Sequence, residues 1–406
     1  MDFFQNIFDM TGFASLLTNP GYILMILIGC ILLFLGISKK YEPLLLVPIG
    51  FGIIIANIPN SNLGVVPVDP SYSLIQIANE YGIINLLYYS LIKTGFLPPL
   101  IFKGIGALTD FGPMLKNLRL VFFGAAAQIG IFSVLIIASF LGFDNNEAAA
   151  LAIIGGADGP TAIYTSIILA PHLLGPIAIA AYSYMALVPV IIPAVVRLLV
   201  SKKELLINMK KQDESSNNLD IKNLDIIKII FPILVTIIVS IIVPSSTTLI
   251  GFLMFGNLLK EIGSSTIRLS KSVSDNILNS STLFLGLTIG ATMTPQAFLN
   301  FETIAIILGG LFAFIISIAG GIIAVKIYNL VNKKKINPLI GATGLSAVPM
   351  ASRVANEIAL KNDPSNHLMN YAMASNISGV IGSAVAAGVL ISYFSCLLYT
   401  SDAADE

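Results

Sequence analysis

The stretch LAIIGGADGPTAIYTSIILA, from Leu151 to Ala170, decides the fold. It is apolar at both ends and carries Gly-Gly-Ala-Asp-Gly-Pro at its centre. Glycine permits backbone angles that other residues avoid, and Pro160 removes a hydrogen-bond donor while favouring the start of a helix. The pattern therefore predicts a helix that is broken within an apolar segment, with Asp158 at the break.

The composition is that of a membrane protein. Of 406 residues, 56% are hydrophobic and 11% are charged, whereas soluble domains carry about 25% charged residues. We therefore expect an all-α polytopic membrane protein. A net charge of zero gives no overall basic character for binding nucleic acid. Two cysteines, Cys30 and Cys396, exclude a disulfide framework, and two histidines are too few for a His-rich metal site.

About ten or eleven membrane elements are expected, because one span needs about 20 apolar residues. Clear apolar segments cover 21–38, 43–58, 82–104, 118–142, 173–200, 226–256, 281–298 and 302–328. Shorter or broken segments cover 147–170, 336–350 and 369–395.

The chain divides into two membrane halves. Residues 1–20 are interpreted as an N-terminal interfacial segment, 21–200 as the first half, and 226–395 as the second half. The polar loop 201–225 between them is predicted to be cytoplasmic. The final residues 396–406, CLLYTSDAADE, match one reading frame of a common transposon-based sequencing adapter. We interpret them as an artefact, and nothing below depends on them.

The distribution of basic residues constrains the path of the broken segment. Cytoplasmic loops are rich in Lys and Arg, which places the basic loop 201–225 inside. Segment 118–142 is predicted to run outward. If 147–170 then crossed the membrane completely, the loop 201–225 would lie on the wrong side. Segment 147–170 is therefore predicted to enter and leave from one face, or to form two half-helices around its break.

The sequence also contains a weak internal repeat. Leu100–Leu115 resembles Leu283–Phe298 at an offset of 184 residues, and Ile153–Ile163 resembles Leu339–Pro349 at an offset of 186 residues. Two matches at nearly one offset predict two inverted structural repeats, whose interrupted segments form a binding site. The alternative is chance similarity among helices rich in small residues.

Asp158 is the main candidate for chemistry. A carboxylate within a bilayer costs several kcal/mol unless it is paired, protonated or bound to a cation. No Lys or Arg lies between Arg119 and Arg197, so no basic partner is close in sequence. A sodium ion prefers oxygen ligands, as hard cations do. The alternative is a structural role as the cap of the second half-helix.

The second break offers a complementary set of groups. Asn337 and Ser346 supply oxygens, and Gly341 and Gly344 let the backbone open. Arg353 is a candidate ligand for an anionic substrate, because guanidinium binds carboxylates through two hydrogen bonds.

Several further polar residues have two readings. Arg353 has the alternative of a salt bridge to Glu357 at helical spacing. Asn376, in a helix rich in small residues, is expected to bind something, whereas Ser378 and Ser383 are explained by close helix packing. Tyr182 and Tyr184 are either interfacial aromatics or proton donors.

These strings resemble a known family, the beta subunits of biotin-dependent, sodium-translocating decarboxylases. The resemblance covers roughly Gly82 to Leu390 and rests on LTDFGPML, GGADGPTAIY, NPLIGATGLSAVPMASRVANEIALKNDPSN and SNISGVIGSAVAAG. Such subunits act in oxaloacetate, methylmalonyl-CoA, glutaconyl-CoA or malonate systems.

The resemblance implies a function and roles for particular residues. A biotin carrier delivers carboxybiotin, which the beta subunit decarboxylates while it consumes a proton and moves sodium outward. Asp158 would be the sodium and coupling residue, Arg353 would lie near carboxybiotin, and Tyr184 would belong to the proton path. Asn337, Ser346 and Asn376 look like further sodium ligands, and Gly155, Gly156, Gly159 and Gly341 like backbone requirements.

The resemblance also implies partners and a location. These are an alpha or carboxyltransferase subunit, a biotin carrier, small gamma or delta membrane subunits, and a homotrimeric beta core in a prokaryotic inner membrane. No biotin-attachment motif is present in this sequence, so biotin would arrive on another chain. Two rival functions are a sodium-coupled carboxylate transporter without decarboxylase activity and a non-catalytic membrane anchor.

Overall fold

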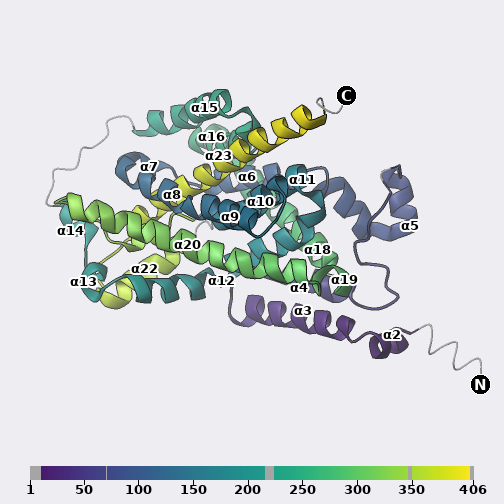
Figure 1. Ribbon diagram of the computed structural model, residues 1–406. Helices are drawn as coiled ribbons and strands as arrows, with labels where there is room; N and C mark the ends of the chain where they lie inside the picture. The colour runs from purple at the N-terminus through teal and green to yellow at the C-terminus, as the bar shows by residue number, and fades with distance from the viewer. Residues whose placement is uncertain (1–10, 70, 215–223, 346–349, 403–406) are drawn as a thin grey trace, which may run out of the picture.

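The computed structural model describes residues 11–69, 71–214, 224–345 and 350–402, and these residues form helices and loops without β-strands (Figure 1). The helices before the central loop are α2 Phe13–Thr18, α3 Gly21–Ser38, α4 Pro43–Ala56, α5 Leu74–Leu87, α6 Leu97–Leu108, α7 Gly112–Lys116, α8 Val121–Ala127, α9 Ile129–Phe140, α10 Asn145–Ala152, α11 Gly159–Leu169, α12 Leu174–Leu199, α13 Lys202–Leu205 and α14 Met209–Glu214. Those after it are α15 Leu224–Ile242, α16 Thr247–Glu261, α17 Ile267–Lys271, α18 Leu278–Thr292, α19 Pro295–Phe298, α20 Phe301–Val331, α21 Leu339–Ala342, α22 Met350–Asn362 and α23 Met369–Asp402.

Short 3₁₀ and π turns join several of these helices. They are η1 Tyr88–Ile92, η2 Leu118–Leu120, η3 Ile153–Gly156, η4 Pro171–Leu173, η5 Pro244–Ser246, η6 Gly263–Ser265 and η7 Ser272–Ile277.

The described residues make an all-α polytopic membrane protein. Five helical stretches are long and apolar enough to cross a bilayer: Gly21–Ser38, Leu118–Phe140, Leu224–Ile242, Thr303–Val331 and Met369–Ser395. Two bent pairs raise the number to seven. Other apolar helices, such as α4 and α11, have fewer than 18 residues, so fewer long spans are present than the ten or eleven elements that the sequence indicates.

Two predicted spans differ from the structure. Segment 82–104 is not one helix, because the chain bends by 67° between Leu74–Ile92 and Leu97–Leu108. Segment 369–395 is not broken, because α23 runs through it as one helix. Its small residues serve close packing and do not interrupt the backbone. Segment 226–256 is also interrupted, at Pro244, since α15 ends at Ile242 and η5 begins at Pro244.

Two helices at opposite edges of the body expose apolar surface. Figure 1 shows α3 along one edge and α15 along the other. Only 17% of the α3 span and 6% of the α15 span are buried, although both are strongly apolar. Exposed apolar surface of this extent is stable against lipid or a protein partner and not against water.

Glycine allows two pairs of helices to cross at backbone contact. Gly52 of α4 meets Gly290 of α18, and Gly106 of α6 meets Gly256 of α16. A Cβ atom on any of these four residues would collide with a backbone carbonyl oxygen of the opposite helix. Small residues of this kind permit tight helix packing in membranes.

Helix α23 lies at the centre of the packing and positions the site. It contacts α8, α11, α16 and α22, which come from both parts of the chain. Figure 1 shows it crossing the body obliquely. Most of its small side chains are buried, Asn376 and Ser383 completely.

The crossing of α6 and α16 gives a stability prediction. We expect Gly256→Ala to lower the free energy of unfolding by about 1–3 kcal/mol, because the new methyl group would force the helices apart. Gly251→Ala is the matched control on the same helix, where a Cβ meets no atom within 4 Å. Thermal unfolding of both variants in detergent measures the difference. Equal melting temperatures would contradict backbone contact at this crossing.

Candidate functional site

The Gly-Gly-Ala-Asp-Gly-Pro stretch forms the tip of a helical hairpin. Helix α10 passes into the 3₁₀ turn η3 and ends there, and α11 begins at Gly159. Ala157 has a left-handed backbone with φ of 54°, which is unusual for a residue with a side chain. Asp158 is the N-cap of α11 and accepts a hydrogen bond from the Thr161 N–H at 3.3 Å. Asp158 therefore caps α11 and is at the same time a buried carboxylate.

The two ends of this hairpin meet. His172, just beyond α11, lies 2.8 Å from a carboxylate oxygen of Glu147 in the first turn of α10. Helices of 8 and 11 residues span about 12 and 16 Å, roughly half of a 30 Å hydrocarbon core. The two arms therefore begin and end together, and Asp158 lies at the tip between them.

A second hairpin surrounds the other break. Helix α21 is followed by Thr343–Leu345, and α22 returns from Met350. The Asn337 side-chain amide donates to the carbonyls of Leu205 and Ile207 at 3.1 and 3.0 Å. Asn366, beyond α22, donates to the same two carbonyls at 3.2 Å each. Both ends of this hairpin are thus fixed to the end of α13.

The tips of the hairpins meet α23. The Ser383 hydroxyl donates to the Asp158 carboxylate at 2.8 Å. Seven residues earlier on α23, the Asn376 amide donates to the carbonyls of Thr343 and Leu345 at 3.1 and 2.5 Å. Asp158 is only 4% exposed, and both α23 residues are completely buried. Helix α23 therefore contacts the carboxylate at the first break and the backbone carbonyls at the second.

Several buried oxygens near these tips have no hydrogen-bond partner among the described residues. They are the hydroxyl oxygens of Thr161 and Tyr182 and the amide oxygens of Gln128 and Asn376. The Tyr182 ring lies against Gly159, where an added Cβ would be 2.6 Å from the ring. A buried polar group without a partner costs about 1–3 kcal/mol. Oxygens of this kind around a carboxylate are suited to a hard monovalent cation.

The glycines that the sequence singles out are at close contacts. A Cβ on Gly155 would lie 2.8–3.0 Å from the Gly130–Ile131 peptide. A Cβ on Gly156 would lie 3.1 Å from the Ile131 side chain and 3.2 Å from Ser383 Cβ. Gly341 in the second hairpin presses in the same way on the Gly321–Ile322 peptide. Side chains at these positions would separate the tips from their supporting helices.

Asn337 and Tyr184, two other predicted site residues, have backbone groups as their hydrogen-bond partners. Asn337 uses its amide for Leu205 and Ile207, and its oxygen accepts from the Leu339 N–H at 3.1 Å. The Tyr184 hydroxyl donates to the Ile307 carbonyl of α20. Ser346 lies outside the described residues.

Arg353 is exposed on α22, next to the loop between α3 and α4. Burial raises the pKa of Glu42 in that loop, and the Arg353 guanidinium acts in the opposite direction. Among the described residues, no ion pair joins Arg353 to Glu357. The alternative of a local salt bridge therefore has no support.

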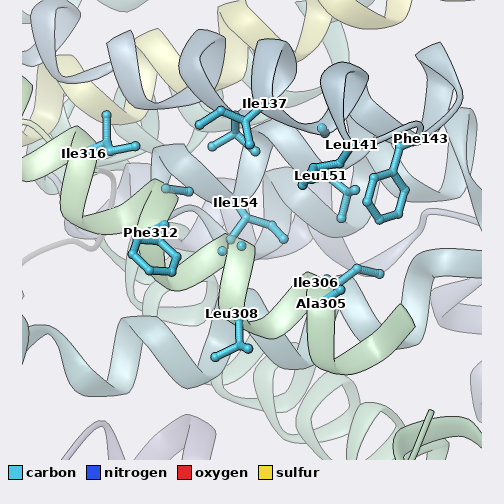
Figure 2. Close-up of a pocket in the computed structure, with 15 residues that line it drawn as sticks. Ile137, Leu141, Phe143, Leu151, Ile154, Ala305, Ile306, Leu308, Phe312 and Ile316 are labelled. Atoms are coloured by element: carbon cyan, nitrogen blue, oxygen red, sulfur yellow. The ribbon is translucent and has the colours of Figure 1, made fainter. Parts of the chain in front are cut away.

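A separate apolar cavity lies behind the first hairpin (Figure 2). Its volume is about 380 Å³, and its lining side chains, which come from α9, η3 and α20 among other elements, include Ile137, Ile154 and Phe312. Figure 2 shows only carbon atoms on the lining side chains. A cavity of this kind offers a cation no ligands, so it is distinct from the polar tips.

Sequence reasoning missed four residues of this arrangement. Ser383 was attributed to packing, His172 was considered as part of a metal site and rejected, and Gln128 was not considered. Tyr182, not Tyr184, is the tyrosine at the Asp158 tip. Only the buried position of Gln128 in an apolar span gave a signal, because a polar amide there requires partners.

The fold and site define a polytopic membrane protein in which one buried helix contacts the tips of two helical hairpins. Comparison with known proteins identifies the family. The profile of the family described as Na⁺-transporting oxaloacetate decarboxylase beta subunit matches residues 21–394. The chain belongs to this family and is a subunit of a sodium-transporting decarboxylase.

Three relatives show the range of the family. The chain is 47% identical to methylmalonyl-CoA decarboxylase subunit beta of Propionigenium modestum, covering 97% of this chain and 98% of the relative. It is 46% identical to glutaconyl-CoA decarboxylase subunit beta of Acidaminococcus fermentans, covering 94% and 97%. It is 40% identical to oxaloacetate decarboxylase beta chain 2 of Salmonella typhi, covering 95% and 98%.

The hairpin geometry predicts the accessibility of its ends. Cysteine placed at Asn145 or at His172, in a chain with its native cysteines replaced by serine, should react with a membrane-impermeant thiol reagent from the same side of the membrane. The reason is the 2.8 Å contact between Glu147 and His172. Labelling of intact cells and of inverted vesicles measures the side. Reaction from opposite sides would mean that 147–170 crosses the bilayer.

Proposed function

We propose that this subunit decarboxylates carboxybiotin from a separate carrier and couples this reaction to outward transport of sodium, with consumption of a proton. The observation that carries the proposal is the buried Asp158 carboxylate at a hairpin tip, beside oxygens without hydrogen-bond partners. A buried carboxylate is costly unless a cation or proton compensates its charge. Sodium is the cation that the family description and the oxygen-rich surroundings favour.

The proposed sodium ligands are Asp158 and Ser383 at the first tip and, about two turns away along α23, Asn376 at the second tip. Ser383 contacts Asp158 directly, and the Asn376 oxygen is buried and lacks a partner among the described residues. Ser346 stays a predicted ligand from the second tip. Asn337 stays a predicted ligand as well; its amide nitrogen donates to two carbonyls, and its oxygen accepts one backbone N–H.

Arg353 is proposed to bind the carboxylate of carboxybiotin at the cytoplasmic face. It is exposed, and its neighbour Glu42 follows the basic pair Lys39–Lys40, which the positive-inside rule places in the cytoplasm. A carrier on the cytoplasmic side would reach this position. Tyr184 is kept as a candidate of the proton path, behind the site and against α20.

The two halves are proposed to be inverted repeats, which would permit alternating access. The crossing of α4 with α18 has the same geometry as the crossing of α16 with α6. In both crossings, each glycine lies against the backbone carbonyl of the residue three positions before the glycine of the opposite helix. Equivalent helices α6 and α18 run in opposite directions, because α6 ends near Lys116 and Arg119 whereas α18 begins after Lys271. Transporters of this design bind ions between their repeats.

The coupling has a definite energetic requirement. Moving one charge against 100 mV costs about 2.3 kcal/mol. Carboxybiotin must therefore bind or react differently in the inward- and outward-facing states, since a ligand shifts a population only through differential affinity. We further propose a prokaryotic inner membrane location and a complex with alpha or carboxyltransferase, biotin carrier and gamma or delta subunits around a homotrimeric beta core.

The first functional prediction concerns Asp158. We expect Asp158→Asn to fold but to lose sodium-dependent decarboxylation, because the amide cannot compensate the charge of a bound sodium ion. The measurement is carbon dioxide release by the whole complex with and without sodium. Normal sodium stimulation in the variant would refute the assignment. Release of no carbon dioxide by the native complex, together with sodium-dependent carboxylate uptake, would favour the rival symporter.

A second functional prediction separates the two binding events. Arg353→Gln should lower decarboxylation about 100-fold, because truncating a charged partner of a carboxylate costs about 2–5 kcal/mol. Sodium binding, measured as stabilisation against heat, should be retained. Glu357→Gln, one turn along the exposed face of α22, is the control and should keep its activity. A parallel loss in both variants would contradict a specific role for Arg353.

A further inference from the structure

We propose that Gln128 is a further ligand of the transported cation and also fixes the second hairpin to the site. Gln128 lies between α8 and α9, where the span Leu118–Phe140 changes from one helix to the next. The inference rests on the proposed sodium site at Asp158 and adds a residue that motif and charge arguments did not identify.

The orientation of the Gln128 amide is determined by its donors. Its nitrogen donates to the carbonyls of Gly124 and Gly379 at 3.2 Å each, and to that of Gly344 at 3.5 Å. These carbonyls belong to three different segments of the chain. Turning the amide over would place its oxygen against three other oxygens, so the network fixes nitrogen toward the carbonyls.

The amide oxygen then faces the first hairpin. A Cβ on Gly156 would lie 3.5 Å from this oxygen and 3.2 Å from Ser383 Cβ. Ser383 in turn donates to Asp158 at 2.8 Å. The oxygen of Gln128 and the side chain of Ser383 therefore border the same glycine of the first hairpin, Gly156.

This oxygen lacks a protein partner. Gln128 is 6% exposed, and its oxygen is buried without a hydrogen bond among the described residues. A buried amide carbonyl left without a partner is destabilising, whereas a bound cation would satisfy it. A neutral oxygen also suits a monovalent ion, because one carboxylate then balances the whole charge.

The double role connects the ion to the second tip. The nitrogen holds Gly344 and the oxygen faces the ion site, so a cation bound near Asp158 would draw on a side chain that also holds the other hairpin. Binding of a cation at the first tip would thereby change the hydrogen bond that Gln128 makes to Gly344 of the second tip. A purely structural anchor at this interface is available for comparison, because the Ser378 hydroxyl donates to the Val121 carbonyl of α8 at 2.6 Å.

The test compares Gln128→Leu, Gln128→Glu and Ser378→Ala in the complete complex. The readouts are the sodium concentration for half-maximal decarboxylation and the sodium-dependent rise in melting temperature. Gln128→Leu should raise the half-maximal concentration about tenfold or more, because a contact to a charged group is lost. Ser378→Ala should stay within about twofold of the native value, since the bond it removes is far weaker than an ion contact.

Gln128→Glu distinguishes a ligand from an anchor. It keeps an oxygen near the ion and adds a second carboxylate, so sodium dependence should persist while calcium becomes an inhibitor. If Gln128→Leu does not fold, the Gln128→Glu variant alone decides. A Gln128→Glu complex that is insensitive to calcium overturns the proposal. Equal shifts in Gln128→Leu and Ser378→Ala, or none in Gln128→Leu, also overturn it. Sodium stimulation surviving Asp158→Asn would instead refute the proposed sodium site itself.

Discussion

The structure depends on burying one carboxylate, that of Asp158, in the interior of a membrane protein. The carboxylate of Asp158 accepts hydrogen bonds from the Thr161 N–H and the Ser383 hydroxyl, which replace hydration that burial removes. The N-terminus of α11 adds a favourable dipole. The break in the helix, the positive φ of Ala157 and the close glycine contacts are all consequences of placing these groups at a hairpin tip.

Part of this arrangement follows from the sequence alone. The glycines and proline around Asp158 mark the break, and the distribution of basic residues requires the segment to return to its own side. Segment 82–104 shows the limit of counting apolar residues, because its 67° bend coincides with Gly95 and the Pro98–Pro99 pair, which such a count ignores. The unbroken helix α23 shows a second limit. Its Gly379 allows the carbonyl of Gly344 to approach closely, and this contact is known only from the structure.

The polar ligands are harder to predict than the break. Ser378 and Ser383 occupy the same kind of sequence, yet one donates to the Val121 backbone and the other to Asp158. Their difference is one of helix rotation, which composition does not encode. Asn337 illustrates the converse, because an asparagine beside a break resembles an ion ligand, while in the structure its amide nitrogen donates to the carbonyls of Leu205 and Ile207. Assigning such residues requires their partners to be known.

Helix α23 shows how one element can serve both hairpins. Asn376 and Ser383 are seven residues apart, so they lie on one face about two turns, or 10 Å, from each other. One contacts the carbonyls of the second tip and the other contacts the carboxylate of the first. Any movement of α23 along its axis would change both sets of contacts together. The hairpin that carries Arg353 and the hairpin that carries Asp158 are therefore joined by a single helix, without a separate chain of side chains.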